Sequence, residues 1–89
     1  MAHGPDITLR YFAWVREKTG RAEERVTLPA GIETVADVLI WLGTRGPEFE
    51  DAFRKPGLIR TAIDQRHVKP DTAIAGAREI AFFPPVTGG

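Results

Sequence analysis

The 89-residue sequence has no cysteine and only two histidines. Without cysteine the chain has no disulfide framework, no thiolate nucleophile and no cysteine-ligated zinc, although this absence does not identify the redox compartment. His3 lies near the start of the chain and His67 in a predicted strand, so the two form neither a metal-ligand cluster nor a nucleophile and base. We interpret each as a structural or exposed histidine and expect no metal site.

The sequence also has no net charge and no long apolar run. Twelve basic and twelve acidic side chains cancel, and no stretch concentrates Lys and Arg among aromatic residues. We therefore expect no nucleic-acid partner. The first residues, MAHGPD, lack the basic and hydrophobic regions of a signal peptide. We expect a cytoplasmic protein without a membrane partner.

What the sequence does contain is a set of short periodic segments, which predict one small domain spanning residues 1–89. Residues 7–12 alternate, with Ile7, Leu9 and Tyr11 on one face, as in a half-buried strand. The segment WVREKTG predicts a short helical turn that ends at Gly20. The segment EERVTLP then predicts a second strand, which ends at Pro29.

The main helix is predicted to begin after Thr34. Asp37 follows three residues later, so the two side chains are able to form a variant of the capping box. The helix ends before Pro47, which has no backbone N–H to continue it. Apolar residues recur at helical spacing along one face; they are Val35, Val38, Leu39 and Leu42.

The second half of the chain returns to strands. The predicted elements are a helical turn at PEFEDAF, a turn at KPG, a strand at LIRTAID, a turn at DQR, a short strand at HV, a loop at KPDTAIAGAR and a last strand at EIAFFP. The order β, β, α, β, β predicts an α+β class, with a mixed sheet covered on one face by the main helix, as in a β-grasp fold.

Most of the polar and aromatic residues fit structural roles. The acidic pairs Glu23 with Glu24 and Glu48 with Glu50 are interpreted as solvated, because carboxylates that work as acid and base face each other across a cleft. The glycines of GTRGPEFE and GLIR lack the spacing and the lysine of a phosphate-binding loop. Trp14 and Trp41 are interpreted as core or interface anchors. No internal group of residues therefore indicates catalysis.

The C-terminal segment AFFPPVTGG is the exception. Pro84 and Pro85 remove two backbone donors directly after a strand, so the chain has to leave the sheet there. Residues 84–89 are predicted to form a projecting tail, with a reach of at most ~20 Å at about 3.3–3.6 Å per residue. In the alternation of the last strand, Ile80 and Phe82 share one face, and we predict that Phe83 is the exposed aromatic residue.

The last four residues suit a narrow channel. Val86 and Thr87 favour extended backbone, and Gly88 and Gly89 have no side chain to obstruct entry. Such a tail is able to carry its α-carboxylate into the active site of another protein. A terminal Gly-Gly by itself favours a different interpretation, ordinary terminal disorder or a glycine left by cloning.

The longer string AFFPPVTGG resembles the C-terminal signature of the small, sulfur-carrying subunit of molybdopterin synthase, the MoaD type. LRYFAWVREKTG resembles the first strand and following helix of the same family. The likeness extends over residues 7–89 and departs in residues 1–5, interpreted as a flexible leader, and in the loop RHVKPDTAIAGA.

The resemblance implies a ubiquitin-like β-grasp fold and chemistry at the terminus. A separate adenylating enzyme, of the E1 type, would activate Gly89 with ATP, and a sulfur donor system would convert it to a thiocarboxylate. Gly88 would give access, and residues Phe83, Pro84, Pro85, Val86 and Thr87 would bind the large subunit of the synthase. The catalytic groups would lie mainly in that subunit, and this chain would bind no cofactor of its own.

In the resembling family the sulfur goes to cyclic pyranopterin monophosphate during molybdenum cofactor biosynthesis. Three alternatives stay open at this point. A sulfur carrier of the thiamine pathway and a ubiquitin-like protein modifier also use a terminal Gly-Gly. A β-grasp binding module would need no free Gly89.

Overall fold

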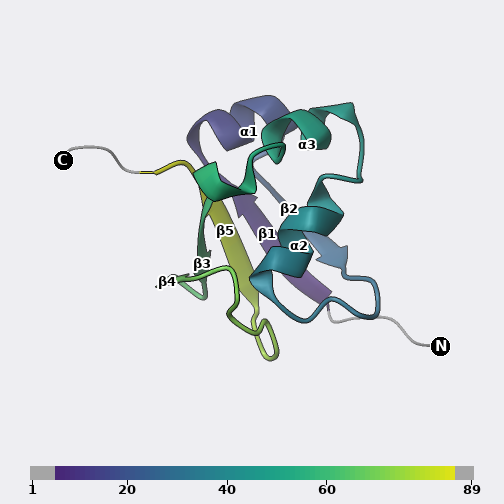
Figure 1. Cartoon of the computed structure of the whole chain (residues 1–89), viewed down its shortest axis with the longest axis vertical. Helices are drawn as coiled ribbons and strands as arrows, with labels where there is room; N and C mark the ends of the chain where they lie inside the picture. The colour runs from purple at the N-terminus through teal and green to yellow at the C-terminus, as the bar shows by residue number, and fades with distance from the viewer. Residues whose placement is uncertain (1–5, 86–89) are drawn as a thin grey trace.

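The strands predicted from alternation form one mixed sheet of five strands in the order β2-β1-β5-β3-β4 (Figure 1). The computed structural model describes residues 6–85. The central pair β1 and β5 is parallel, and the other neighbours are antiparallel. The strands are β1 (Asp6–Tyr11), β2 (Glu23–Thr27), β3 (Arg60–Ile63), β4 (Arg66–Val68) and β5 (Glu79–Phe83).

The main helix, α2, begins and ends where the sequence predicts. Thr34 and Asp37 form the capping box: the Asp37 N–H donates to Thr34 Oγ1 at 3.2 Å, and the Thr34 N–H donates to Asp37 Oδ2 at 3.0 Å. Both bonds satisfy amides that a helix start leaves free. The helices are α1 (Ala13–Thr19), α2 (Val35–Leu42) and α3 (Pro47–Ala52), with a 3₁₀ turn, η1 (Pro56–Leu58).

The turns after α1 and between β3 and β4 use the left-handed backbone region. Gly20 ends α1 with φ 76° and donates its N–H to the Arg16 carbonyl at 2.9 Å. Asp64 and Gln65 both have positive φ, 47° and 71°. That pair of angles is typical of the two-residue turn of a β-hairpin, and it joins β3 to β4.

One face of the sheet and the apolar stripe of α2 enclose the core. The three alternating residues of β1, Ile7, Leu9 and Tyr11, are buried, as the sequence predicts. The whole predicted stripe of α2 is buried as well. The α+β class and the single-face cover are therefore confirmed, with α1 and α3 closing one end of the layer (Figure 1).

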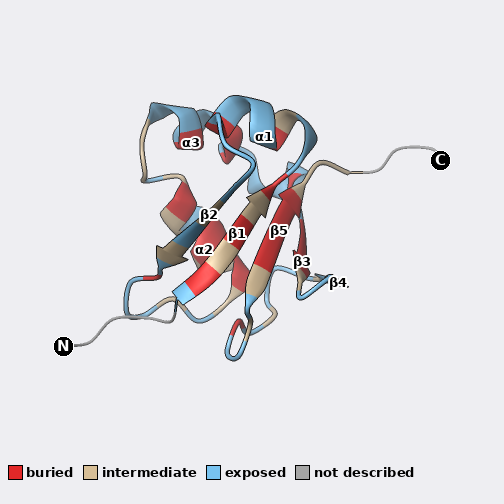
Figure 2. Ribbon diagram, turned by 180° about the vertical axis from the view of Figure 1, so that it is seen from behind, coloured by how far each residue is buried: buried red, intermediate tan, exposed pale blue. Residues whose placement is uncertain are grey.

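No helix among residues 6–85 covers the opposite face of the sheet, which is called the outer face below (Figure 2). On this face Thr8 of β1 lies beside Glu79 of β5, and Arg10 lies beside Ala81. Across residues 6–85, none of the helices has the length and apolar character needed to cross a bilayer. The predicted leader at residues 1–5 lies outside the described residues.

Candidate functional site at the end of the central strand

The predicted tail leaves the sheet from β5, which is hydrogen-bonded to a neighbouring strand on each side. Such a strand has no free edge, so its end is held in position by two ladders. Pro84 and Pro85 follow directly and are partly buried. The last described residue, Pro85, therefore follows a strand that is paired on both sides.

The two phenylalanines of β5 have different environments. Phe82 is 0% exposed, whereas Phe83 is only partly buried and lies on the outer face. Phe83 is thus more exposed than Phe82, as predicted, but it is half-buried and not the exposed aromatic residue that the alternation predicts. Its role in partner binding stays a prediction.

Aromatic packing fixes the end of β5 from the core side. The Phe82 ring stacks on Tyr11 with centroids 5.8 Å apart and meets Phe53 edge-on at 5.6 Å. Such pairs add about 0.5–1.5 kcal/mol each beyond the area that they bury. The residue before Phe83 is therefore held rigidly, and this fixes where Phe83 lies on the outer face.

The Phe83 side chain lies beside β3 and β4. Its Cα partner on β3 is Arg60, and its ring centroid lies 5.1 Å from that of His67 on β4. His67 is exposed, as predicted. No group of three or more potential metal-ligating side chains occurs within residues 6–85.

A second aromatic residue at the end of the neighbouring strand was not predicted as part of the site. Phe12 is 41% exposed, and its N–H donates to the Phe82 carbonyl at 3.0 Å. The Arg10 guanidinium carbon lies 5.2 Å from the Phe12 ring centroid. Alternation in the sequence places Phe12 on the face opposite the core, but only the parallel pairing of β1 with β5 brings it beside the root of the tail.

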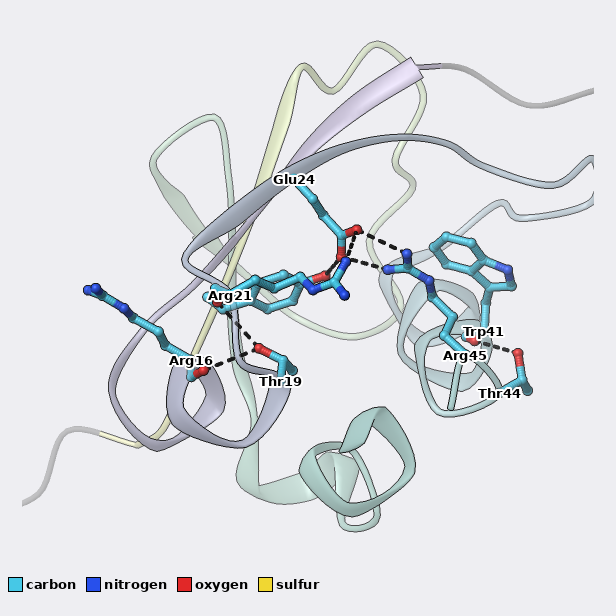
Figure 3. A network of polar contacts seen from close by, with 8 residues as sticks. Arg16, Thr19, Arg21, Glu24, Trp41, Thr44 and Arg45 are labelled. Atoms are coloured by element: carbon cyan, nitrogen blue, oxygen red, sulfur yellow. Dashed lines mark hydrogen bonds and ion pairs between the residues drawn. The ribbon is translucent and has the colours of Figure 1, made fainter. Parts of the chain in front are cut away.

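The interpretation of Glu24 as a solvated carboxylate is wrong. Its side chain is 13% exposed and forms a paired contact with Arg45, whose Nη1 and Nη2 donate to Glu24 Oε2 and Oε1 at 2.6 and 2.9 Å (Figure 3). The Tyr11 hydroxyl donates to Glu24 Oε2 at 2.6 Å, and Arg21 donates to Oε1 at 3.0 Å. This network links β1 and β2 to the segment between α2 and α3.

The network shifts the pKa values of its members in opposite directions. Burial raises the pKa of Tyr11 far above its usual value, and its bond to the Glu24 carboxylate raises it further. Burial acts to raise the pKa of Glu24 too, but the hydrogen bonds from Arg45 and Tyr11 outweigh it and leave the pKa below its usual value. Glu24 is thus a charged structural group at neutral pH.

The remaining predicted site residues, Val86, Thr87, Gly88 and Gly89, lie outside the described residues. Elsewhere, a cavity of about 280 Å³ lies between α1 and α3 and includes Trp14 and Leu58. Trp14 and Trp41 are both partly buried against the core. The described part of the site is therefore the end of β5, with Phe83, Pro84 and Pro85, bordered by Phe12 and His67.

Comparison with known proteins agrees with this architecture. The family model described as the ThiS family matches residues 9–89. The molybdopterin synthase sulfur carrier subunit of Haemophilus influenzae is 34% identical over 93% of this chain and 99% of that protein. The corresponding subunit of Escherichia coli is 32% identical over the same shares.

The solved structure of SAMP1, a small archaeal modifier protein from Haloferax volcanii, superposes with a TM-score of 0.70. Its sequence is 30% identical, and the match covers 94% of this chain and 99% of that one. The ubiquitin-like β-grasp fold is therefore shared along essentially the whole chain. With the family model matched from β1 to the last glycine, the chain belongs to the ThiS family, together with the molybdopterin synthase sulfur carrier subunits that it resembles in sequence.

Proposed function

We propose that this chain is the sulfur carrier subunit of a molybdopterin synthase. The observation that carries the proposal is the relation to two such subunits over 93% of the chain, in a fold whose central strand leads directly into the segment PPVTGG. Its partner is then the large subunit of that synthase.

The chemistry takes place at the α-carboxylate of Gly89. A carboxylate is a poor electrophile, so an adenylating enzyme first joins it to AMP from ATP and releases pyrophosphate. A sulfide-level donor then attacks the carbonyl carbon and displaces AMP, which leaves a thiocarboxylate. Both steps use groups that this chain does not supply, apart from the terminus itself.

The thiocarboxylate sulfur is a soft nucleophile that is ionised at neutral pH. In the large subunit it forms a bond to a carbon of cyclic pyranopterin monophosphate and displaces an oxygen substituent of that carbon, whose C–O bond breaks. Water then cleaves the acyl–sulfur bond and restores the Gly89 carboxylate. The chain is thus a cosubstrate that is recharged after each transfer, and Phe83, Pro84 and Pro85 serve to position the tail.

The test is intact mass spectrometry after incubation with the activating enzyme, ATP and a sulfide donor. We expect one oxygen to be replaced by sulfur, located by fragmentation to Gly89. Hydroxylamine added before the sulfide donor is expected to trap the acyl-adenylate as a hydroxamate. A variant without Gly89 is the matched control and is expected to give neither product.

A second candidate, a protein modifier, is favoured by the structural similarity to SAMP1. It shares the activation step but ends in an amide bond to a lysine of another protein. Adducts on substrate lysines, with no transfer of sulfur to the pyranopterin, would replace the carrier proposal. A folded chain that forms neither thiocarboxylate nor adduct would be a binding module.

A further inference from the structure

The covalent reach of the tail limits which surface a partner has to touch. Four residues follow Pro85 in the sequence. At no more than about 3.6 Å per residue they span at most ~14 Å. Any active site that receives Gly89 therefore brings its own surface close to the end of β5. We therefore expect that partner surface to contact the side chains around Phe83 on the outer face.

The outer face carries different charge patterns on its two sides. On the β1 side, Arg10 lies 3.8 Å from Glu23 and 3.9 Å from Glu79, so its charge is balanced within the chain. On the β3–β4 side, Arg60 and Lys69 make no ion pair with any residue between 6 and 85. Arg25 on β2 makes no ion pair within residues 6–85 either, but it lies alone at the opposite edge of the sheet. Arg60 and Lys69 are two unbalanced cations on the same side of β5 as the His67 ring.

Arg60, His67 and Lys69 border a shallow hollow in the surface. A depression of about 360 Å³ is lined by Arg60, Thr61, His67, Val68 and Lys69. Figure 2 shows β3 and β4 beside β5 at this edge of the sheet. A depression of this kind accepts a side chain from a partner, and two cations at its border favour a negatively charged one.

We infer that the hollow bordered by Arg60, His67 and Lys69 binds a carboxylate-bearing segment of the large subunit. Phe83, beside the hollow, makes an apolar contact with the same subunit. This inference rests on the proposed function, because the tail is what brings the large subunit to this surface. The two kinds of contact have separate roles. Phe83 supplies the apolar contact that slows dissociation, whereas Arg60 and Lys69 accelerate and orient association.

The test reverses the charge at two positions with Arg60→Glu and Lys69→Glu. Neither side chain has an ion pair within the described chain, so the fold loses no internal ion pair. The control is Arg25→Glu, an exposed residue on the outer face of β2. It changes the net charge as much as Arg60→Glu or Lys69→Glu alone, so each single variant is also compared with it. Three strand spacings separate β2 from β3, which is about 14 Å and exceeds the Debye length of about 8 Å at physiological salt.

Surface plasmon resonance with the wild-type large subunit measures the association and dissociation rate constants separately. At physiological salt, where the control position is screened from the hollow, we expect the double variant to associate about 10-fold more slowly, with little change in the dissociation rate constant. Raising the salt concentration to about 1 M is expected to remove the difference, because the Debye length falls to about 3 Å. The Arg25→Glu control is expected to associate at the wild-type rate.

Two results would overturn the inference, and they are distinguishable. If the wild-type chain binds the large subunit and the double variant associates as fast as the control, the hollow has no acidic partner and the proposed function stands. If the wild-type chain does not bind the large subunit at all, the proposed function fails and this inference fails with it. Thermal unfolding of each variant verifies that the binding data come from folded protein.

Discussion

Neighbouring residues Phe82 and Phe83 provide a sharp test, because the same substitution is expected to have opposite main effects at the two positions. Phe82 is 0% exposed within an aromatic cluster, so Phe82→Ala is expected to cost about 3–5 kcal/mol of folding stability. Phe83 is partly buried. Full burial of a large apolar side chain contributes about 1.5–3 kcal/mol to folding, so Phe83→Ala is expected to cost about half of that, or about 1 kcal/mol of folding stability. In binding, an aromatic anchor at an interface centre contributes ~2 kcal/mol or more, which is about 30-fold in Kd.

Urea unfolding followed by the fluorescence of Trp14 and Trp41 gives the stability of each variant, and calorimetric titration with the large subunit gives Kd. We expect Phe83→Ala to lose more binding than folding free energy. Phe82→Ala is expected to lose more folding than binding free energy. Phe82→Leu replaces it in the comparison if the alanine variant does not fold. The reasoning is refuted if Phe83→Ala destabilises the fold strongly and leaves Kd unchanged, since the partner surface then lies elsewhere.

Three further perturbations test the tail, the polar network and the main helix. Replacing Gly88 with a bulky residue, or adding one residue after Gly89, is expected to abolish sulfur transfer at unchanged thermal stability; untrimmed extended protein that still supports synthesis contradicts the terminal mechanism. The pKa of Glu24 is lowered in the folded state, so its contribution to stability is present above pH about 4.5, its ordinary value, and is lost as the pH falls through the folded-state pKa. Glu24→Gln is therefore expected to reduce the acid dependence of urea unfolding, and an unchanged dependence refutes this assignment. Thr34→Ala is expected to cost about 1 kcal/mol through loss of the helix cap, measured by the same unfolding assay; a cost near zero would show that the capping box adds nothing.

Local sequence patterns predict the elements of this fold well, because each element has a signal within a few residues. The alternation of β1, the stripe of α2 and the capping box at Thr34 all correspond to what the structure shows. The strand predicted at LIRTAID is shorter than expected, since Leu58 belongs to η1 and β3 begins at Arg60. The proline of KPG starts a 3₁₀ turn there instead of a simple turn.

Contacts between distant segments were not predictable from the sequence alone. Glu24 and Arg45 are 21 residues apart, and nothing near either residue indicates that they meet. Two adjacent carboxylates in a short strand indicate a solvated pair when no structure is known. Only the strand order and the position of the segment after α2 bring the guanidinium to the carboxylate. The same is true of Phe12, which lies beside Phe82 because β1 and β5 are parallel.

The activation chemistry and the choice of partner depend on different parts of this chain. Adenylation requires a terminal carboxylate that reaches an active site, and sulfur carriers and protein modifiers share this requirement. A terminal Gly-Gly therefore does not determine which reaction follows. What differs between such proteins has to be the surface that a partner meets before the terminus reacts, since specificity arises from differences in affinity. In this chain Pro84 and Pro85 follow directly after Phe83 at the end of β5. Phe12 and the hollow bordered by Arg60 and Lys69 lie next to this strand end. Because the four residues after Pro85 span at most ~14 Å, we expect the partner that fits this surface to be the one that receives Gly89.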